Sequence, residues 1–231
     1  MRERPQSPFC DMRDALSSTR IWFWQWFFDR LYTDLAGVYD LVAWLASGGL
    51  WYQWVEAAAR FLADDPVLEV GFGRGHLLVR LACQGRNVVG VDRSPQMVAA
   101  ARRRATATGV PAKLVQADAT ALPFADQTFG TLVTTFPAPY VLSETAQQEF
   151  ARVLKPGGRW VWVDAPRWPH WPRRLAVLWF FQHLRRLAPL PTEDFPPTAL
   201  ISAFSAHTAI VPVAETTVKV LVLEKRSPEG P

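Results

Sequence analysis

The chain has 231 residues, 49% hydrophobic and 20% charged, a composition that supports a sizeable buried core in one large domain with extensions and excludes a disordered chain. Its 25 basic and 21 acidic side chains leave a net charge of +4, too small a bias to indicate a nucleic-acid-binding protein. Two distant cysteines, Cys10 and Cys83, exclude a disulfide scaffold and a cysteine-based zinc site, and no apolar stretch reaches the roughly 20 residues of a membrane-spanning helix.

Residues 1–62 are predicted to form an N-terminal helical extension rich in aromatic side chains. Residues 1–20 are polar and contain prolines, which indicates loose packing. Residues 21–62 are predicted to contain two or three helices, and the run IWFWQWFF (21–28) is too uniformly apolar for a helix with one face in solvent. No small-residue cleavage site follows this run, so it does not indicate a signal peptide.

Strands alternate with helices from residue 67 to residue 164, which is typical of a parallel sheet built from βαβ units. We expect strands at 67–70, 87–92, 113–117, 129–136 and 159–164. Helices are expected at 76–85, at 94–109 with Ser94 as N-cap and Pro95 in the first turn, and at 143–154 with Ser143 as N-cap. A turn is expected at 155–158 (KPGG), and 208–217 and 217–226 are predicted to close the fold as a β-hairpin.

Three glycines lie directly after the first of these strands and directly before the first helix, in the segment VLEVGFGRGH. Glycine permits positive φ and lets a ligand lie against the backbone, and a helix N-terminus offers N–H groups to an anion. The spacing of Gly71, Gly73 and Gly75 differs from the G-x-G-x-x-G of dinucleotide folds and from the phosphate-binding loop of nucleotide triphosphatases. The loop alone leaves a nucleotide-type site and a purely structural loop equally open.

Two aspartates at strand ends bear on what the loop binds. Asp92 ends the second strand, where a carboxylate can accept hydrogen bonds from both ribose hydroxyls. Asp118 follows the third strand, where a carboxylate could accept a hydrogen bond from an adenine amino group. Either aspartate alone could be a turn residue, but both are expected with the glycine loop at the carboxyl edge of a parallel sheet, where open α/β sheets bind ligands.

In four ordered segments the sequence resembles the class I S-adenosylmethionine-dependent methyltransferases, nearest to the branch with quinone-biosynthesis and phospholipid methyltransferases (methyltransferase type 11-like domain). The segments are EVGFGRG (69–75), VDRSPQM (91–97), ADATALPFADQTFGTLVTT (117–135) and FARVLKPGG (150–158). The resemblance covers about residues 67–164 and the closing hairpin. It implies an α/β, Rossmann-like seven-stranded sheet, mostly parallel with an antiparallel last strand, and helices on both faces.

The resemblance also implies the cofactor S-adenosyl-L-methionine, with S-adenosyl-L-homocysteine as product. Glu69 and the three glycines match the positions at the methionine part, where Glu69 would serve the cationic amino group and the helix N-terminus the carboxylate. Asp92 matches the ribose position. Phe72 and Arg74 depart from the family pattern, in which smaller or acidic residues are more usual in the loop.

The remaining cofactor positions implied by the resemblance lie around the adenine and at the fourth strand. Arg93 and Met97 fall beside the adenine, and Asp118 and Ala119 match the pair at its edge. Thr134 or Thr135 matches the end of the fourth strand. Tyr39, in a Tyr-Asp pair that often precedes this core in the family, could help to cover the cofactor.

Methyl transfer is an in-line displacement that needs aligned reactants and excluded water, and it needs a general base only if the acceptor loses a proton. Candidate acid–base residues are Tyr140, Asp164 and His170. Each has a structural alternative: Tyr140 could be a packing residue, Asp164 a strand-end turn residue and His170 an interface residue. The dispersed histidines do not indicate a metal site, and the run 102–104 (RRR) is expected to be a solvated helix face.

Two aromatic regions outside the common core are expected to decide the acceptor. Within the predicted methyltransferase domain (63–226, followed by a tail at 227–231), residues 165–200 form a predicted substrate-cap insert. In the segments 21–32 and 171–187, arginines lie close to aromatic apolar residues, which suits either the membrane interface or a lid over the active site.

In the family, the N-terminal helices and this insert build the acceptor pocket, and here they carry most of the tryptophans. We therefore predict methyl transfer to a hydrophobic small molecule or lipid, such as a quinone precursor or a phospholipid headgroup, with no nucleic-acid partner. The expected location is the cytoplasm, with peripheral membrane contact left open. The alternative is a non-catalytic, S-adenosylmethionine-binding interaction protein associated with a membrane.

Overall fold

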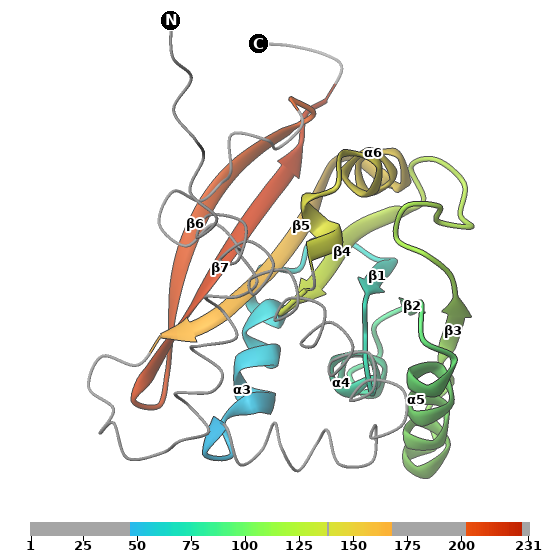
Figure 1. Ribbon diagram of the computed structural model, residues 1–231, viewed down its shortest axis with the longest axis vertical. Coiled ribbons are helices and arrows are strands. Elements are labelled where there is room, and N and C mark those ends of the chain that lie inside the picture. The colour runs from blue at the N-terminus through green and yellow to red at the C-terminus, as the bar shows by residue number, and fades with distance from the viewer. Residues whose placement is uncertain (1–46, 138, 168–201, 228–231) are drawn as a thin grey trace, which may run out of the picture.

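The computed structural model describes residues 47–137, 139–167 and 202–227 (Figure 1). Over these ranges the helices are α3 (Trp51–Glu56), η1 (Ala57–Phe61), α4 (His76–Cys83), α5 (Pro95–Thr108), η2 (Pro139–Leu142) and α6 (Glu144–Val153). The strands are β1 (Val67–Val70), β2 (Val88–Asp92), β3 (Lys113–Gln116), β4 (Phe129–Thr135), β5 (Leu154–Arg167), β6 (Phe204–Val213) and β7 (Thr216–Lys225). The predictions for Tyr39, His170, 21–32 and 171–187 lie outside the described residues.

The seven described strands form one sheet in the order β3-β2-β1-β4-β5-β7-β6. Strands β1 to β5 are parallel, whereas β7 runs antiparallel to β5 and to β6. The predicted sheet, mostly parallel with an antiparallel last strand, is therefore confirmed. Because β2 and β4 flank β1, the strand order reverses at β1, and ligands of open α/β sheets bind at the carboxyl ends of strands at such a point.

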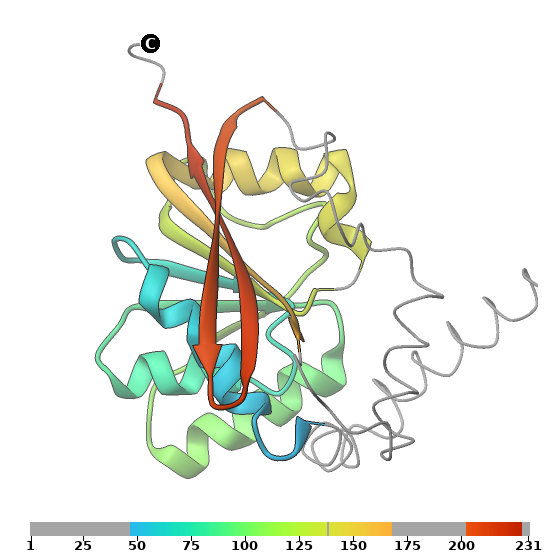
Figure 2. The same cartoon turned by 90° about the vertical axis from the view of Figure 1, so that its left-hand side faces the viewer.

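Helices cover both faces of the sheet, with α6 on one face and α3, α4 and α5 on the other (Figure 2). Side chains alternate along each strand, so Val67 packs on the side of α4 while Leu68 and Val70 pack on the side of α6. All four residues of β1 are buried, as expected for a central parallel strand whose two faces are both covered. No helix within the described ranges is both long and apolar enough to cross a membrane.

The two predicted N-caps differ in the structure. Ser94 caps α5 as expected, because its hydroxyl oxygen accepts the backbone N–H of Met97 and Pro95 occupies the first turn. Ser143 stands at the N-cap position of α6, but its side chain makes no capping hydrogen bond there. Its carbonyl oxygen instead accepts the N–H of Gln147, the ordinary first bond of the helix.

The expected turn at 155–158 is a bulge inside β5. Phe129 of β4 pairs with Leu154, and the next pair joins Thr131 to Arg159, so the segment between them bulges out of the pairing with β4. Gly157 has φ +71°, which a bulge of this kind requires. The strand therefore begins before the turn sequence and continues after it, because pairing with β4 holds both ends.

The described part of the predicted extension packs in the same core as the sheet. Of the two or three helices predicted within 21–62, the last is an α-helix only from Trp51 to Glu56 and continues as the 3-10 helix η1. The indole N–H of Trp54, which is buried, donates to the hydroxyl of Thr216 in β7 at 2.9 Å. Trp51 packs on Phe136 with ring centroids 4.6 Å apart.

Candidate functional site

The glycine loop joins the carboxyl end of β1 to α4, next to the reversal in strand order. Gly71, Gly73 and Gly75 all have positive φ, at +72°, +54° and +71°. Their N–H groups are used within the fold: they donate to the carbonyl oxygen of Val91, to Oδ2 of Asp92 and to the carbonyl oxygen of Phe72, respectively. The glycines thus supply a tight backbone path and a surface without side chains, and their N–H groups are not free donors for an anion.

Close contacts explain two of the three glycines. A Cβ on Gly71 would lie 2.6 Å from the hydroxyl oxygen of Tyr140, and one on Gly75 would lie 2.7 Å from Cβ of Ala101. Among the described residues, no heavy atom lies within 4 Å of the position of a Cβ on Gly73. The backbone at Gly73 therefore leaves room beside the loop for a bound group.

Phe72, which departs from the family pattern, is buried under the loop. Its ring reaches β2, where a Cβ on Gly90 would lie 2.6 Å from Cδ1 of Phe72. The large residue is accommodated because the facing strand position has no side chain. Phe72 therefore leaves the outer surface of the loop open.

Glu69 is a buried carboxyl group directly below the loop, with a side chain 1% exposed. Burial, and secondly the neighbouring Asp92 carboxylate, raise the pKa of Glu69 to about 8, while a hydrogen bond from the backbone of Leu78 in α4 lowers it. Its Oε2 atom has no hydrogen-bond partner among the described residues. The Glu69 carboxyl is thus protonated at neutral pH, and a cationic group placed against it would favour its ionised form.

Asp92 ends β2 and organises the turn between β2 and α5. Its Oδ2 accepts the N–H of Gly73 and its Oδ1 accepts the N–H of Ser94, both at 2.9 Å. Burial raises the pKa of the Asp92 carboxyl, and the N–H groups of Ser94 and Gly73 and the charge of Arg93 oppose that rise. Asp92 therefore links the glycine loop to the end of the neighbouring strand.

Asp118 is exposed just beyond β3. Its Oδ1 accepts hydrogen bonds from the backbone N–H and the hydroxyl of Thr120, and these bonds, with a smaller effect of Arg93, lower the pKa of the carboxyl. The N–H of Ala117 donates to the carbonyl oxygen of Asp92, which joins this loop to the end of β2. The structure thus brings both predicted aspartates to the same edge as the glycine loop.

The other predicted cofactor residues differ in exposure. Arg93 is exposed, whereas Met97 and Ala119 are buried. Thr134 is fully buried, and its hydroxyl oxygen accepts the indole N–H of Trp160 at 3.0 Å, so it serves the core of the sheet. Thr135, the last residue of β4, is half-buried at the carboxyl edge.

Two of the three candidate acid–base residues lie in the described part of the chain. Tyr140 donates its hydroxyl to the carbonyl oxygen of Val70 at 3.1 Å, which places it against the glycine loop. It also packs on the hydrophobic cluster below α6, as its structural alternative predicts. Asp164 is half-buried in β5, one position beyond Val163, which pairs with Thr135.

Sequence reasoning missed Arg152 and Phe136. Arg152 of α6 donates to the carbonyl oxygens of Leu122 and Phe124 and pairs with Glu149 and Asp126, so it holds the loop that follows Asp118. Phe136, directly after β4, has φ +45°, which is unusual for a residue other than glycine. The Arg152 position falls inside the segment FARVLKPGG, but nothing in the spacing of that segment shows which loop it holds.

Comparisons with known proteins identify the family. A family model described as a methyltransferase domain matches residues 67–158. The demethylmenaquinone methyltransferase of Thermus thermophilus is 34% identical over 160 residues, which cover 67% of this chain and 73% of the relative. The C-methyltransferase UbiE of ubiquinone and menaquinone biosynthesis from Dinoroseobacter shibae is 34% identical over 149 residues, and the match covers 61% of this chain but only 59% of that relative.

The chain belongs to the class I S-adenosylmethionine-dependent methyltransferases.

Solved structures agree on the fold. The YcgJ protein of Bacillus subtilis aligns with a TM-score of 0.57 at 20% identity and covers 76% of this chain and 99% of its own. Geranyl diphosphate C-methyltransferase of Streptomyces coelicolor, solved with S-adenosyl-L-homocysteine, aligns with a TM-score of 0.54 at 18% identity and covers 74% of this chain and 78% of its own. At these identities the likeness shows the fold of the methyltransferase.

The cofactor of this methyltransferase is S-adenosyl-L-methionine, and the chemistry of the site fits it. The cofactor carries a cationic amino group, which matches the unpartnered Oε2 of buried Glu69. Its ribose hydroxyls are donors that suit a carboxylate such as Asp92, and its methionine chain needs space such as that beside the backbone at Gly73. Over the described ranges, His, Cys, Asp and Glu side chains form no group of three that could hold a metal ion.

Proposed function

We propose that this methyltransferase methylates a hydrophobic acceptor of the quinone-precursor class. The observation that carries the proposal is the similarity to a demethylmenaquinone methyltransferase over 160 residues, most of that relative's length. The similarity to UbiE proteins supports the same class.

The proposed cofactor site uses the residues gathered at the carboxyl edge of β1, β2 and β3. When bound, the cofactor supplies a methyl group already activated by its sulfonium. Glu69 would hold the amino group in ionised form, the loop at Gly73 would carry the methionine chain, and Asp92 would bind the ribose hydroxyls. The adenine would lie near Arg93, Met97, Asp118 and Ala119.

The described residues also suggest an apolar wall on the acceptor side. Phe136 directly follows β4, and Trp51 packs on it. Both rings are half-buried and lie near Thr135, at the carboxyl edge of the strand beside β1. Aromatic side chains at this position suit a planar hydrophobic acceptor and help to exclude water.

Proton removal from the acceptor is proposed for Asp164 rather than Tyr140. The Tyr140 hydroxyl donates to the backbone of β1, which suits a positioning role. Asp164 is half-buried at the carboxyl end of the sheet. Asp164→Asn should lower kcat by at least about 100-fold, in the range of general-base removal, and leave the cofactor affinity unchanged. Equal kcat values for the variant and the wild type would contradict this role.

The acceptor proposal is tested with radiolabelled S-adenosyl-L-methionine and three acceptors: a demethylated naphthoquinol, phosphatidylethanolamine vesicles and a short RNA. We expect label in the quinol alone, and less of it at the same cofactor concentration when Asp92→Ala replaces the wild type. Transfer to the vesicles alone would assign the phospholipid class. Tight cofactor binding with no transfer to any acceptor would favour the non-catalytic alternative.

Peripheral membrane contact through 21–32 and 171–187 remains a proposal drawn from sequence, because both segments lie outside the described residues. Sedimentation with anionic vesicles at low salt tests it. If arginines bind lipid phosphates, the protein should be enriched in the vesicle pellet at low salt, and this enrichment should be lost at high salt. Equal amounts of protein in the supernatant with and without vesicles would favour the lid interpretation.

A further inference from the structure

Helix α5 packs directly on the glycine loop. A Cβ on Gly75 would lie only 2.7 Å from Cβ of Ala101, so the helix and the loop touch without an intervening side chain. Arg104 lies three residues after Ala101 and therefore on the same face of α5. Of the three consecutive arginines of the helix, Arg104 is therefore the one on the face that contacts the loop.

Arg104 makes two hydrogen bonds at the loop. Its Nε donates to the carbonyl oxygen of Arg74 at 3.1 Å, and its Nη2 lies 2.8 Å from Nε2 of His76. A guanidinium can only donate, so the His76 nitrogen accepts and the imidazole is neutral in this arrangement. One planar side chain thus joins the last part of the loop to the first residue of α4.

The peptide between Arg74 and Gly75 is held at both ends. Its carbonyl oxygen accepts from Arg104, and its N–H donates to the carbonyl oxygen of Phe72. In the middle of the loop, the N–H of Gly73 donates to Asp92. The Arg104 contact therefore completes a set of bonds that fixes the path of the backbone around Gly73, the open part of the proposed cofactor site.

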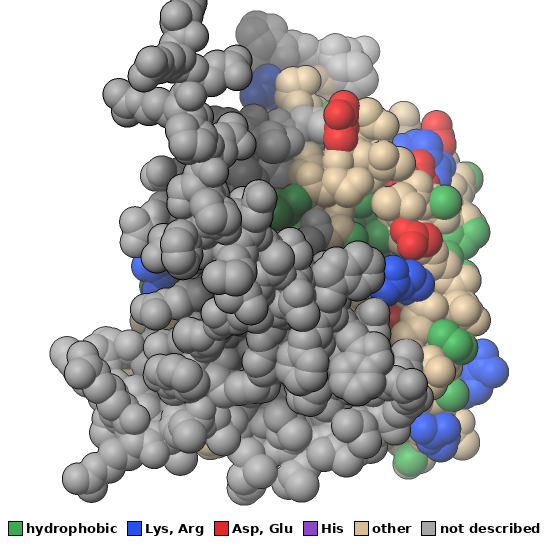
Figure 3. Space-filling model, in the orientation of Figure 1, with side chains coloured by type: hydrophobic (Ala, Val, Ile, Leu, Met, Phe, Trp, Pro, Cys, Tyr) green, Lys and Arg blue, Asp and Glu red, His purple; other side chains and the backbone are tan. Residues whose placement is uncertain are grey.

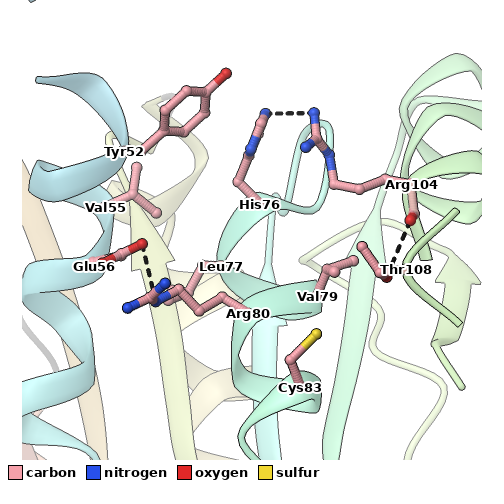
Figure 4. Close-up of a pocket in the computed structure, with 10 residues that line it drawn as sticks. All are labelled: Tyr52, Val55, Glu56, His76, Leu77, Val79, Arg80, Cys83, Arg104 and Thr108. Carbon is pink, nitrogen blue, oxygen red and sulfur yellow. Dashed lines mark hydrogen bonds and ion pairs between the residues drawn. The ribbon is translucent and has the colours of Figure 1, made fainter. Parts of the chain in front are cut away.

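His76 is itself held by an aromatic contact from α3. The ring of Tyr52 packs on the imidazole with centroids 4.1 Å apart. Figure 4 shows Tyr52, His76 and Arg104 next to one another, contributed by α3, α4 and α5, at one end of a cavity of about 270 Å³. The ion pair of Arg80 with Glu56 lies further along α4 and contacts neither Arg104 bond.

The neighbouring arginines provide the contrast. Arg102 and Arg103 are exposed, as the expected solvated face requires, and Figure 3 shows basic side chains over the side of the molecule where α5 lies. Arg104 is half-buried. The sequence expectation of one solvated run is therefore correct for two of the three arginines and wrong for Arg104.

We propose that Arg104 is a positioning residue for the cofactor, which acts by holding the glycine loop through the Arg74 carbonyl and through His76. It touches the loop from behind, so it sets the shape of the cofactor site without being a ligand. A preorganised loop loses less conformational freedom when it binds. This inference rests on the proposed cofactor site.

The test measures the affinity for S-adenosyl-L-homocysteine by calorimetry, which needs no acceptor. Arg104→Leu should weaken binding about tenfold, the size of effect typical of losing a charge-assisted hydrogen bond, whereas Arg103→Leu, with the same change of charge, should stay within about twofold. Arg104→Lys should fall in between, because an ammonium group cannot reproduce the planar fork. It also serves as the second variant should Arg104→Leu fail to fold. If Arg104→Leu, or Arg104→Lys in its place, bound no more weakly than Arg103→Leu, the proposal would be overturned.

A double-mutant cycle distinguishes positioning from general destabilisation. His76→Leu should weaken binding less than Arg104→Leu, and the double variant should bind no more weakly than Arg104→Leu alone, because both changes break one link. Losses that simply multiply would mean that the two residues act independently and would overturn the link. No binding by the wild type would instead refute the proposed cofactor site, whereas wild-type binding that only Asp92→Ala weakens would refute Arg104 alone.

Discussion

The surroundings of Glu69 favour the protonated form of its carboxyl group. Burial and the charge of Asp92 raise its pKa from 4.5 to about 8. Between these two pH values the folded protein holds more protons at this position than the unfolded chain does. The contribution of Glu69 to the free energy of unfolding therefore falls as the pH rises from 4.5, and it levels off above about 8.

Glu69→Gln should remove this pH dependence from the cofactor-free protein. At pH 5 the variant and the wild type should have similar free energies of unfolding, and at pH 8.5 the variant should be the more stable, by at least about 1 kcal/mol. Urea denaturation at the two pH values measures the difference, with the exposed Glu215→Gln as the matched control. Parallel pH profiles for wild type and Glu69→Gln would contradict the raised pKa.

Asp92 has a structural role beside its proposed role as a cofactor ligand, which makes the choice of substitution informative. Asp92→Ala removes the acceptor for two backbone N–H groups as well as for the ribose, and should weaken S-adenosyl-L-homocysteine binding by about 1–3 kcal/mol. Asp92→Asn keeps one acceptor oxygen and should lose less. Calorimetry checks both, and an Ala variant with wild-type affinity would exclude the assigned role.

At the scale of elements, Arg152 fixes the loop between β3 and β4 to α6. Its guanidinium donates to two loop carbonyls, Leu122 and Phe124, and pairs with Glu149 and Asp126. Asp118, the proposed adenine-edge residue, lies at the start of that loop. The loop therefore depends on a side chain that is distant in sequence and that touches no part of the proposed cofactor site.

Arg152→Leu should lower the free energy of unfolding by about 2 kcal/mol, because it leaves several loop acceptors without a donor. The cofactor affinity should fall as well, since the loop carrying Asp118 loses its anchor. Urea denaturation and calorimetry measure the two effects, with the exposed Arg102→Leu on α5 as control. Unchanged stability would show that solvent replaces these bonds at little cost.

The elements that sequence predicted best are those with local signals. Ser94 and Pro95 mark the start of α5, and the last two segments form the expected hairpin. The turn at 155–158 became a bulge because pairing with β4, a contact distant in sequence, decides where β5 begins. The local sequence of 155–158 carries no information about this pairing.

The candidate site divides in the same way. The glycines and Asp92 were predicted from the motif and its position after strands, and Glu69 from the resemblance to the family, and the structure places them together. Three features depend on packing against other strands and helices and could not be predicted. These are the use of the glycine N–H groups within the fold, the position of Phe72 beneath the loop, and the difference between Arg104 and Arg103. The sequence does not distinguish the three consecutive arginines, because only the packing of the helix on the loop separates Arg104 from the other two.

At the scale of the whole molecule, the buried bond from Trp54 to Thr216 ties α3 to the closing hairpin. Thr216→Val keeps the shape but leaves a buried indole N–H without its acceptor, which should cost about 1–3 kcal/mol of unfolding free energy. The adjacent Thr217→Val, at a half-buried position, is the control and should change stability little. Chemical denaturation followed by tryptophan fluorescence measures both, and equal stabilities for the two variants would contradict the role of the bond.

The two partners of that bond are 162 residues apart, and the hairpin is made after every other described strand. During synthesis on the ribosome, the hydrogen bond of the Trp54 indole can therefore form only after Thr216 has been made, when almost all of the domain has emerged. Nascent chains that end before β7 contain β1 to β6 but lack the strand that supplies Thr216, the acceptor of the Trp54 indole. Truncation before Thr216 would thus leave the Trp54 indole without this acceptor, a state that chaperones and proteases recognise.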